Sequence, residues 1–171
     1  MKASAKALEQ YPDFNSSLAP DGGSIILIKY YHIRIAIDTP EGLMVPVIRD
    51  VDKKNIYELS KELADVNQKV RNKRISPDDL AGGTFTISSL GGIGGTYFTP
   101  IVNMPEVAIL GVSRANHEPV FNGNNFDSRL LLPLTLSYDH RVIDGAMAAR
   151  FMKFLNELLS DINNLSDVNL V

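Results

Sequence analysis

The chain has 171 residues and a formal net charge of -3; 44% of its residues are hydrophobic and 22% are charged. This composition is typical of a soluble globular domain with a sizeable core, and it indicates neither nucleic acid nor an anionic membrane as a partner. The absence of cysteine excludes disulfides, thiolate metal ligands and a thiol nucleophile, and no apolar run approaches the ~18 residues of a membrane span. We therefore expect a protein of the bacterial cytoplasm or the mitochondrial matrix.

The first half of the chain is predicted to alternate between helices and strands. Small and apolar residues favour a helix at the start, and Tyr11-Pro12 ends it because proline cannot continue a helix. Beyond His32, isoleucine alternates with mostly polar residues, which favours a strand. The predicted elements are, in chain order, a helix over residues 2–10, a turn over 21–23, strands over 24–29 and 31–38, a turn over 39–42 and a strand over 43–48.

The second half continues the α/β order. Apolar residues at alternating steps of three and four predict a helix from Ile56 to Val70, and Ser76-Pro77 followed by acids predicts a capped helical turn. Asn122-Gly123 indicates a tight hairpin turn. The remaining predicted elements are strands over residues 84–88, 107–112 and 134–139, and a helix that begins at about residue 146 and carries Phe151, Leu155, Leu158, Leu159 and Ile162 on one side.

The stretch from Ser137 to Gly145 lies where the last strand ends and the last helix begins. A histidine there, His140, is well placed to transfer a proton, although a hydrogen-bonded junction residue is the simpler interpretation. Asp144, which precedes Gly145, equally fits the pattern of a helix N-cap. The whole segment, however, resembles the signature of the acyltransferase (E2) subunits of 2-oxoacid dehydrogenase complexes, which it matches at Asp139, His140, Arg141, Asp144 and Gly145.

The resemblance extends from Met1 to Val171 and includes residues 38–50, 82–91 and 105–111. It implies an α/β fold like that of chloramphenicol acetyltransferase, a mixed β-sheet with flanking helices. It also implies one catalytic domain over residues 1–171, without the strand and the part of the first helix with which the family begins. The Ala/Pro linkers that join lipoyl and partner-binding modules in whole E2 chains are absent from this sequence.

The family's site residues fall on named positions of this chain. The resemblance makes His140 the general base, Ser88 the hydroxyl donor to the tetrahedral intermediate and Asp144 a positioning residue, either as a cap or paired with Arg141. Without the resemblance, Ser88 reads as a solvated serine at a strand end. The positions that correspond to the family's coenzyme A contacts are Asp38, Asn67, Ser88, Ser89, Gly111 and Ser113.

Other conspicuous residues need no catalytic role. The glycine-rich run 91–95 lacks the Gly-Lys-Ser/Thr ending of a phosphate loop, so we expect a mobile loop beside the site with unusual backbone angles. His32 on the polar face of a strand and His117 in a turn-rich segment are expected to be solvated or locally hydrogen-bonded. With three histidines, no cysteine and no close His-Glu pair, no metal site is expected.

The function implied is acetyl transfer between dihydrolipoamide and coenzyme A, since residues 88–91 and 98–103 look closer to pyruvate-type E2 than to other types. A homotrimer with shared sites is expected, assembling into a cubic or icosahedral core served by a lipoyl domain, with E1 and E3 subunits held through modules absent here. The apolar ending, Leu165, Val168, Leu170 and Val171, is expected to dock onto another subunit. The alternatives are a non-catalytic structural core subunit and a small-molecule O-acetyltransferase.

Overall fold

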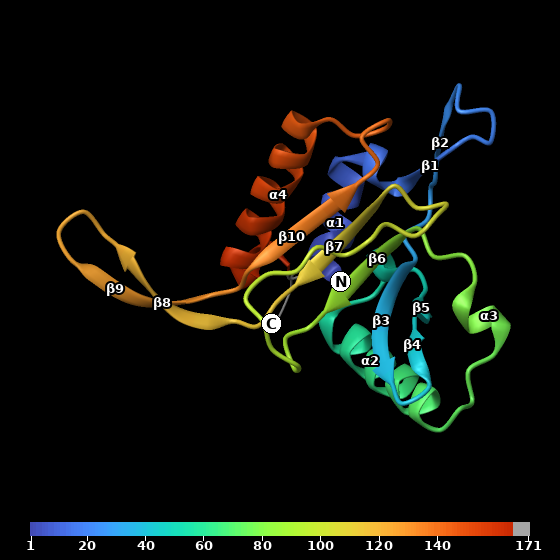
Figure 1. Ribbon diagram of the computed structural model, residues 1–171, viewed down its shortest axis with the longest axis horizontal. Coiled ribbons are helices and arrows are strands. Elements are labelled where there is room, and N and C mark those ends of the chain that lie inside the picture. Colours follow the sequence, from blue (N-terminus) through green and yellow to red (C-terminus); the bar gives the residue numbers. More distant parts are fainter. Residues whose placement is uncertain (166–171) are drawn as a thin grey trace.

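The computed structural model describes residues 1–165, apart from the side chain of Ile162, and has a mixed six-stranded sheet at its centre. β3, β6 and β7 run parallel, and the other strands run antiparallel to their neighbours. The carboxyl ends of the parallel strands therefore meet at one edge, while β10 ends at the opposite edge (Figure 1). Across the sheet the order is β10 (Leu134–Tyr138), β7 (Ala108–Val112), β6 (Phe85–Ser89), β3 (Ile33–Thr39) and β4 (Gly42–Met44), and β5 (Val47–Ile48) also pairs with β3.

Helices cover one face of this sheet. Phe85 of β6 points to them, with its ring centroid 6.3 Å from that of Phe151, which in turn stacks on Phe14 at 4.1 Å. These three phenylalanines are fully buried at the centre of the core. The α-helices are α1 (Lys2–Gln10), α2 (Ile56–Arg71), α3 (Pro77–Leu80) and α4 (Gly145–Ser160), and short 3-10 helices span Pro12–Asn15, Val51–Lys53 and Ile162–Asn164.

Side chains of alternate strand residues point to the second face, away from the helices. Phe85 and Ile87 are buried against the helices, as predicted, but Thr84 and Thr86 are buried as well. The Thr86 hydroxyl donates a hydrogen bond to Glu106, which precedes β7. The chain just before β7 therefore covers part of the second face.

Most predicted elements are present, but the strand predicted over residues 43–48 is interrupted. β4 and β5 pair with β3 in one continuous register, Ile37 opposite Met44 and Ile33 opposite Ile48. Between them the carbonyl of Pro46 accepts the N–H of Ile35 at 3.0 Å, but proline has no N–H to return. The missing donor divides one ladder into two short strands.

Two hairpins project from the body of the molecule (Figure 1). The strand predicted over residues 24–29 is the shorter β2 (Ile25–Leu27), and its partner β1 (Ser16–Leu18) was not predicted. β8 (Asn116–Phe121) and β9 (Phe126–Leu131) form the second hairpin. Its turn lies at the predicted position and is tight: the Asn122 N–H donates to the carbonyl of Asn125 at 2.9 Å, so that only two residues lie between the bonded pair.

The β8–β9 hairpin also corrects the prediction for His117, which lies within β8 and not in a turn-rich segment. Its strands contain a proline and several exposed polar and apolar residues on both faces, so the sequence lacks the alternation of a half-buried strand. The imidazole Nδ1 of His117 lies 3.4 Å from the hydroxyl of Ser128 on β9. The side chain is exposed, in agreement with the prediction of a solvated or locally bonded histidine.

Candidate active site

His140 follows β10 in a turn that is fixed by backbone hydrogen bonds. The N–H of Asp139 donates to the carbonyl of Val107 at 2.8 Å, which ties the end of β10 to the start of β7. The carbonyl of Asp139 accepts the N–H groups of Val142 and Ile143, both at 3.0 Å, and the Ile143 side chain is fully buried. Between these anchors the imidazole of His140 is exposed, with its ring 5.7 Å from that of Tyr138.

Arg141 pairs with the aspartate before His140, not with the one after it. The Asp139 carboxylate accepts the backbone N–H of Arg141 at 3.0 Å and its guanidinium nitrogens at 2.6 and 2.9 Å. These bonds hold the pKa of Asp139 below its ordinary value. The predicted alternative of a pair between Arg141 and Asp144 is therefore wrong. Aspartates lie on both sides of Arg141, and the sequence spacing does not indicate which of them it binds.

Asp144 is the N-cap of α4, the other role predicted for it. Its Oδ1 accepts the N–H of Met147 at 2.7 Å, and its own backbone is extended (φ −88°, ψ 165°). A capping carboxylate satisfies an N–H that the helix itself leaves without a partner, and it also interacts favourably with the helix dipole. Asp144 thus sets where the helix begins, four residues after His140.

Ser88 lies on β6 near the carboxyl edge of the parallel strands. In the sheet it stands between Ala36 of β3 and Gly111 of β7, and Thr135 of β10 lies opposite Gly111. The neighbouring Ile87 packs into the core beneath the helices, so Ser88 faces the other side of the sheet. The serine is half-buried there.

Gly111, one of the predicted coenzyme A positions, has a packing reason to be glycine. A Cβ at this position would lie 2.3 Å from Oγ1 of Thr135 and 3.1 Å from the ring of Phe98. The Thr135 hydroxyl donates to the carbonyl of Phe98 at 2.8 Å, which holds this covering segment against β7. Gly111 therefore lets the chain of residues 98–100 approach the sheet beside Ser88.

The other predicted coenzyme A positions lie toward the same edge. Ser89 follows Ser88, Asp38 is exposed near the end of β3, and Ser113 is buried just beyond β7. Asn67 is half-buried on α2, whose carboxyl end is tied to the β3–β4 turn by an ion pair between Lys73 and Glu41. The structure therefore gathers these positions with Ser88 and Gly111 at one end of the molecule.

The glycine run beside them is a loop in which Gly94 and Gly95 have positive φ angles, 135° and 89°, as predicted for unusual backbone.

The structure does not bring Ser88 and His140 together within one chain. Thr135 is level with Ser88, and β10 then runs antiparallel to β6 for five more residues before His140. At ~3.3 Å per residue along a strand and ~4.8 Å between strands, the two residues are roughly 15–20 Å apart. Figure 1 shows the loop after β10 at the end of the sheet opposite to the β3–β4 turn. Ser88 and His140 of one chain therefore cannot both contact one thioester.

A buried polar cluster on the same sheet face as Ser88 was not predicted from the sequence. Glu106 accepts a hydrogen bond from Thr86 at 2.5 Å, and its other oxygen lies 3.3 Å from Nε of Arg34. Burial raises the pKa of the Glu106 carboxyl, and the two partners oppose that shift. The three residues come from distant parts of the chain, so only the strand register brings them together.

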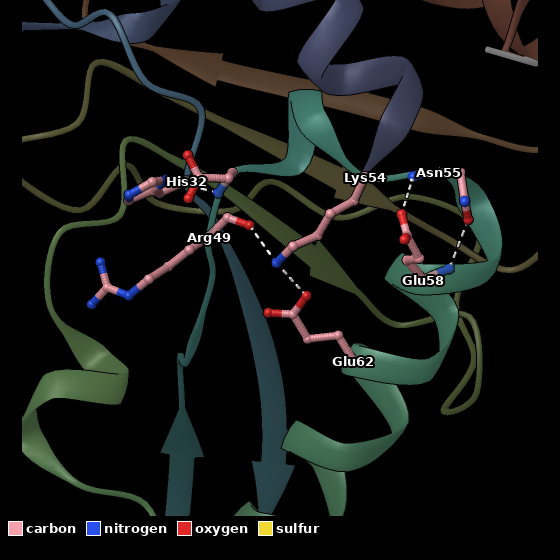
Figure 2. Close-up of polar contacts among 7 residues, drawn as sticks. His32, Arg49, Lys54, Asn55, Glu58 and Glu62 are labelled. Atoms are coloured by element: carbon pink, nitrogen blue, oxygen red, sulfur yellow. Dashed lines mark hydrogen bonds and ion pairs between the residues drawn. The ribbon is translucent and has the colours of Figure 1, made fainter.

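His32 has a structural partner, as predicted, although it lies just before β3 rather than on it. Figure 2 shows His32 beside the chain at Arg49, where its Nδ1 accepts the N–H of Asp50 at 3.0 Å. On the other side of this chain, toward α2, Lys54 binds the carbonyl of Arg49 and the carboxylate of Glu62. These contacts hold the chain between β5 and α2 and use His32 as an acceptor.

The part of the chain that the structure describes contains neither a candidate metal site nor a membrane-spanning helix. No group of three His, Asp or Glu side chains there could hold a metal ion. No helix within residues 1–165 has the length and apolar character needed to cross a membrane.

The sequence matches the family of 2-oxoacid dehydrogenases acyltransferase (catalytic domain) over residues 1–166. The chain belongs to this family. The dihydrolipoyllysine-residue acetyltransferase component of the pyruvate dehydrogenase complex from Pseudomonas aeruginosa is 62% identical over 165 residues, which are 96% of this chain and 30% of that protein. The chain thus spans about a third or less of this and two other full-length relatives that it matches.

Solved structures agree with this membership. A dihydrolipoamide acetyltransferase of Azotobacter vinelandii, studied for the role of a serine, a histidine and an asparagine in its catalytic mechanism, is 58% identical with a TM-score of 0.94, covering 96% of this chain and 68% of that one. The cubic core of a pyruvate dehydrogenase multienzyme complex is 59% identical, with the same TM-score and coverage. Chloramphenicol acetyltransferase, at 18% identity and a TM-score of 0.59, covers 92% of this chain and 74% of its own, and confirms the predicted fold class.

Proposed function

We propose that this protein transfers an acetyl group between dihydrolipoamide and coenzyme A, as the acetyltransferase core of a pyruvate dehydrogenase-type complex. The observation that carries the proposal is the arrangement of Ser88, His140 and Asp144. Their residue types and spacing along the chain parallel the serine, histidine and asparagine studied in the Azotobacter enzyme, whose last residue is an amide instead of a carboxylate. An exposed imidazole on a fixed turn suits proton transfer better than a purely structural role.

The chemistry follows from the two side chains. A thiol with an ordinary pKa of ~8.5 is mostly protonated at neutral pH, so attack on a thioester needs a base, and the imidazole of His140 takes the thiol proton as the new carbon–sulfur bond forms. The carbonyl oxygen becomes an oxyanion, to which the Ser88 hydroxyl donates a hydrogen bond. Collapse breaks the old carbon–sulfur bond, and the leaving thiolate recovers the proton from His140. No covalent intermediate with the protein is formed.

The active unit we propose is a trimer whose sites each combine Ser88 of one chain with His140 of a neighbour. The separation of roughly 15–20 Å within a chain supports this, because a base acts only within hydrogen-bond reach, ~3 Å, of the proton it removes. The sheet face that carries Ser88 has no helix over it and is covered only in part, by residues 98–106 of the same chain, which leaves room for a neighbour. Coenzyme A would bind at the edge that gathers Asp38, Asn67 and Ser89.

The further assembly is proposed from the relatives. The cubic core formed by a homologue that is 59% identical supports assembly of the trimers into a larger core of this kind. The lipoyl group would arrive on a carrier domain. The protein would work in the bacterial cytoplasm, since the relatives compared above are bacterial proteins. Of the residues predicted to dock onto another subunit, Val168, Leu170 and Val171 lie outside the described residues, and Leu165 packs beside the core of its own chain.

An acceptor panel tests the proposed reaction. Acetyl transfer from acetyl-CoA should be measured to dihydrolipoamide and to a set of hydroxyl compounds. We expect transfer to the dithiol to be far faster than to any hydroxyl. Preference for a hydroxyl acceptor would identify a small-molecule O-acetyltransferase, and no transfer by a folded oligomer would favour a structural core subunit.

Subunit mixing tests the shared site. Inactive Ser88→Ala and His140→Ala proteins should be combined under conditions that exchange subunits. Because some interfaces would then unite an intact serine with an intact histidine, part of the activity should return. Each protein taken alone through the same exchange is the control. Mixed oligomers that form and stay inactive would contradict the shared site.

A further inference from the structure

Residues 98–106 form a covering segment that is attached at both ends to the sheet face of Ser88. At one end the carbonyl of Phe98 accepts the hydroxyl of Thr135 on β10 at 2.8 Å. At the other end the carboxylate of Glu106 accepts the hydroxyl of Thr86 on β6 at 2.5 Å. We call these bonds the Phe98 anchor and the Glu106 anchor. The segment itself belongs to no strand of the described chain, so threonine side chains hold it to the sheet.

The two anchors lie on two sides of Ser88. Thr86 precedes Ser88 by two residues on β6, so it points to the same face about 7 Å away, at ~3.3 Å per residue. The Phe98 anchor is level with Ser88, with only Gly111 of β7 between them. Phe98 and the buried Pro100 lie 3.1 and 3.2 Å from the place that a Cβ of Gly111 would occupy. The covering segment is therefore a wall beside Ser88.

The Glu106 anchor uses a buried carboxylate whose charge is compensated separately. The Glu106 side chain is 1% exposed, and its second oxygen lies 3.3 Å from Nε of Arg34 without a hydrogen bond to it. Arg34 reaches this place by crossing Gly83, where a Cβ would lie 2.3 Å from the arginine Cγ. The arginine thus offsets the charge, while the bond from Thr86 fixes the segment. A neutral acceptor at position 106 could make the same bond.

We propose that Thr86 and Glu106 are positioning residues for acetyl transfer: their bond holds the covering segment against the thioester at Ser88 and keeps water from it. The inference rests on the proposed acetyl transfer. Water can attack the thioester in place of a thiol. A carbon–oxygen bond then forms, the carbon–sulfur bond of acetyl-CoA breaks, and a proton of the water passes to the leaving thiolate, which gives acetic acid and coenzyme A. A segment held at both ends limits this reaction by excluding water.

A plainer role for the Glu106 anchor is to stabilise the sheet. Thr84 provides the comparison, because it is buried on the same strand and the same face as Thr86. Its hydroxyl donates to the carbonyl of His32 at 3.2 Å instead of to the covering segment. Loss of either hydroxyl should lower the free energy of unfolding by a similar amount. Only loss of the Thr86 hydroxyl should alter the reaction.

Thr86→Val and Thr84→Val make the same chemical change with and without loss of the anchor. In Thr86→Val we expect kcat for acetyl transfer from acetyl-CoA to dihydrolipoamide to fall ~10–100-fold, since a misplacement of about 1 Å can cost ~10²-fold. The KM for acetyl-CoA should change little, and the fraction of acetyl-CoA that ends as acetate should rise severalfold. Thr84→Val should keep the wild-type kcat and acetate fraction. Thr86→Ser, which retains the hydroxyl, should keep both as well.

A second pair of variants tests the acceptor after the charge has been removed. Arg34→Met/Glu106→Gln keeps an oxygen that can accept the Thr86 hydroxyl, whereas Arg34→Met/Glu106→Leu does not. We expect the first to retain kcat and the acetate fraction near their wild-type values, and the second to behave like Thr86→Val. This pair decides the question if Thr86→Val does not fold.

Equal kcat and equal acetate fractions in Thr86→Val and Thr84→Val would overturn the inference, and so would equal values in the two double variants. A lower kcat with an unchanged acetate fraction would also contradict it, because the segment would then not exclude water.

Amide hydrogen exchange provides a readout that does not need acetyl transfer. The N–H groups of residues 99–104 should exchange at least ~10-fold faster in Thr86→Val than in Thr84→Val, since one hydrogen bond to a charged group corresponds to about that factor. Equal exchange in the two variants would show that the Glu106 anchor does not hold the segment. If the wild-type protein transfers no acetyl group, the proposed function is wrong, and hydrogen exchange alone then tests the anchor.

Discussion

The two ends of the central sheet hold their functional residues by different means. At the His140 end, the turn is made by residues that are close in sequence: Asp139 binds Arg141, and Asp144 caps the helix that follows. At the Ser88 end, each position depends on strands and helices from distant parts of the chain, and Gly111 fits only because Thr135 and Phe98 pack beside it. The turn at the His140 end is shaped mainly by local hydrogen bonds, with one long-range anchor from Asp139 to Val107, whereas the Ser88 end depends on strand register throughout.

This difference has a consequence for mutations. At the His140 end, which we call the local end, a change should act on the one bond that it removes. Its effects on chemistry and on stability can therefore be separated. At the Ser88 end, which we call the register end, a change should disturb neighbours on two or three strands, because protein interiors are closely packed. Substitutions at both ends test the comparison, beginning with the residue proposed to perform the chemistry.

His140→Ala should have the largest effect on activity. General-base catalysis contributes ~10²–10⁴ in rate, so kcat for acetyl transfer should fall by at least ~10²-fold, while the KM for acetyl-CoA should change little. Because the imidazole is exposed and its ring lies beside that of Tyr138, the melting temperature should stay nearly the same. His117→Ala is the matched control and should retain full activity. Near-normal turnover of a folded His140→Ala protein would remove His140 from the mechanism.

Ser88→Ala should lower kcat by ~10²–10³-fold, the usual loss of one oxyanion donor, and should change KM much less. The neighbour Ser89, predicted to contact coenzyme A, provides the contrast: Ser89→Ala should raise KM and leave kcat nearly unchanged. Steady-state kinetics with both substrates varied separates the two patterns. If Ser88→Ala changed only KM, the serine would be a binding residue and not an oxyanion donor.

How far the site can be predicted from the sequence follows the same division. The N-cap role of Asp144 and the strand-to-helix change at His140 depend on neighbours in the chain and were predicted correctly. The pairing of Arg141 is also local but was assigned to the wrong aspartate, because acids two residues before and three residues after Arg141 are both within its reach. Spacing alone does not choose between them.

The register end could not be predicted in the same way. Ser88 was found through the family resemblance, and by itself it reads as a solvated serine. The contact of Arg34 with the buried Glu106 needs the order of three parallel strands, which local patterns do not contain. The turn of the β8–β9 hairpin was predicted, but its two strands were missed for a related reason: a ribbon that no other strand covers lacks the one-sided apolar pattern by which strands are predicted.

Gly111→Ala should show the sensitivity of the register end. The new Cβ would lie 2.3 Å from the Thr135 hydroxyl oxygen, so the hydrogen bond to Phe98 or the strand itself must shift. Overpacking of this kind costs ~1–3 kcal/mol, and chemical denaturation should show that loss together with lower activity. Gly92→Ala is the control, because nothing lies within 4 Å of its Cβ position and its φ is not positive. Equal stability of the two variants would contradict the close packing at Gly111.

Asp144 gives the smallest expected effect and the sharpest test of the local end. Removing an N-cap side chain costs ~0.5–2 kcal/mol, so Asp144→Ala should lower the free energy of unfolding by about that much and slow catalysis through the turn that carries His140. Asp144→Asn keeps an oxygen that can accept the N–H of Met147, now 2.7 Å away. It should therefore retain nearly full stability and activity. The asparagine studied in the Azotobacter enzyme makes the same amide chemically reasonable in this fold. If Asp144→Asn is as stable as the wild type but loses as much activity as Asp144→Ala, the negative charge itself serves catalysis, and capping is then only part of what Asp144 does.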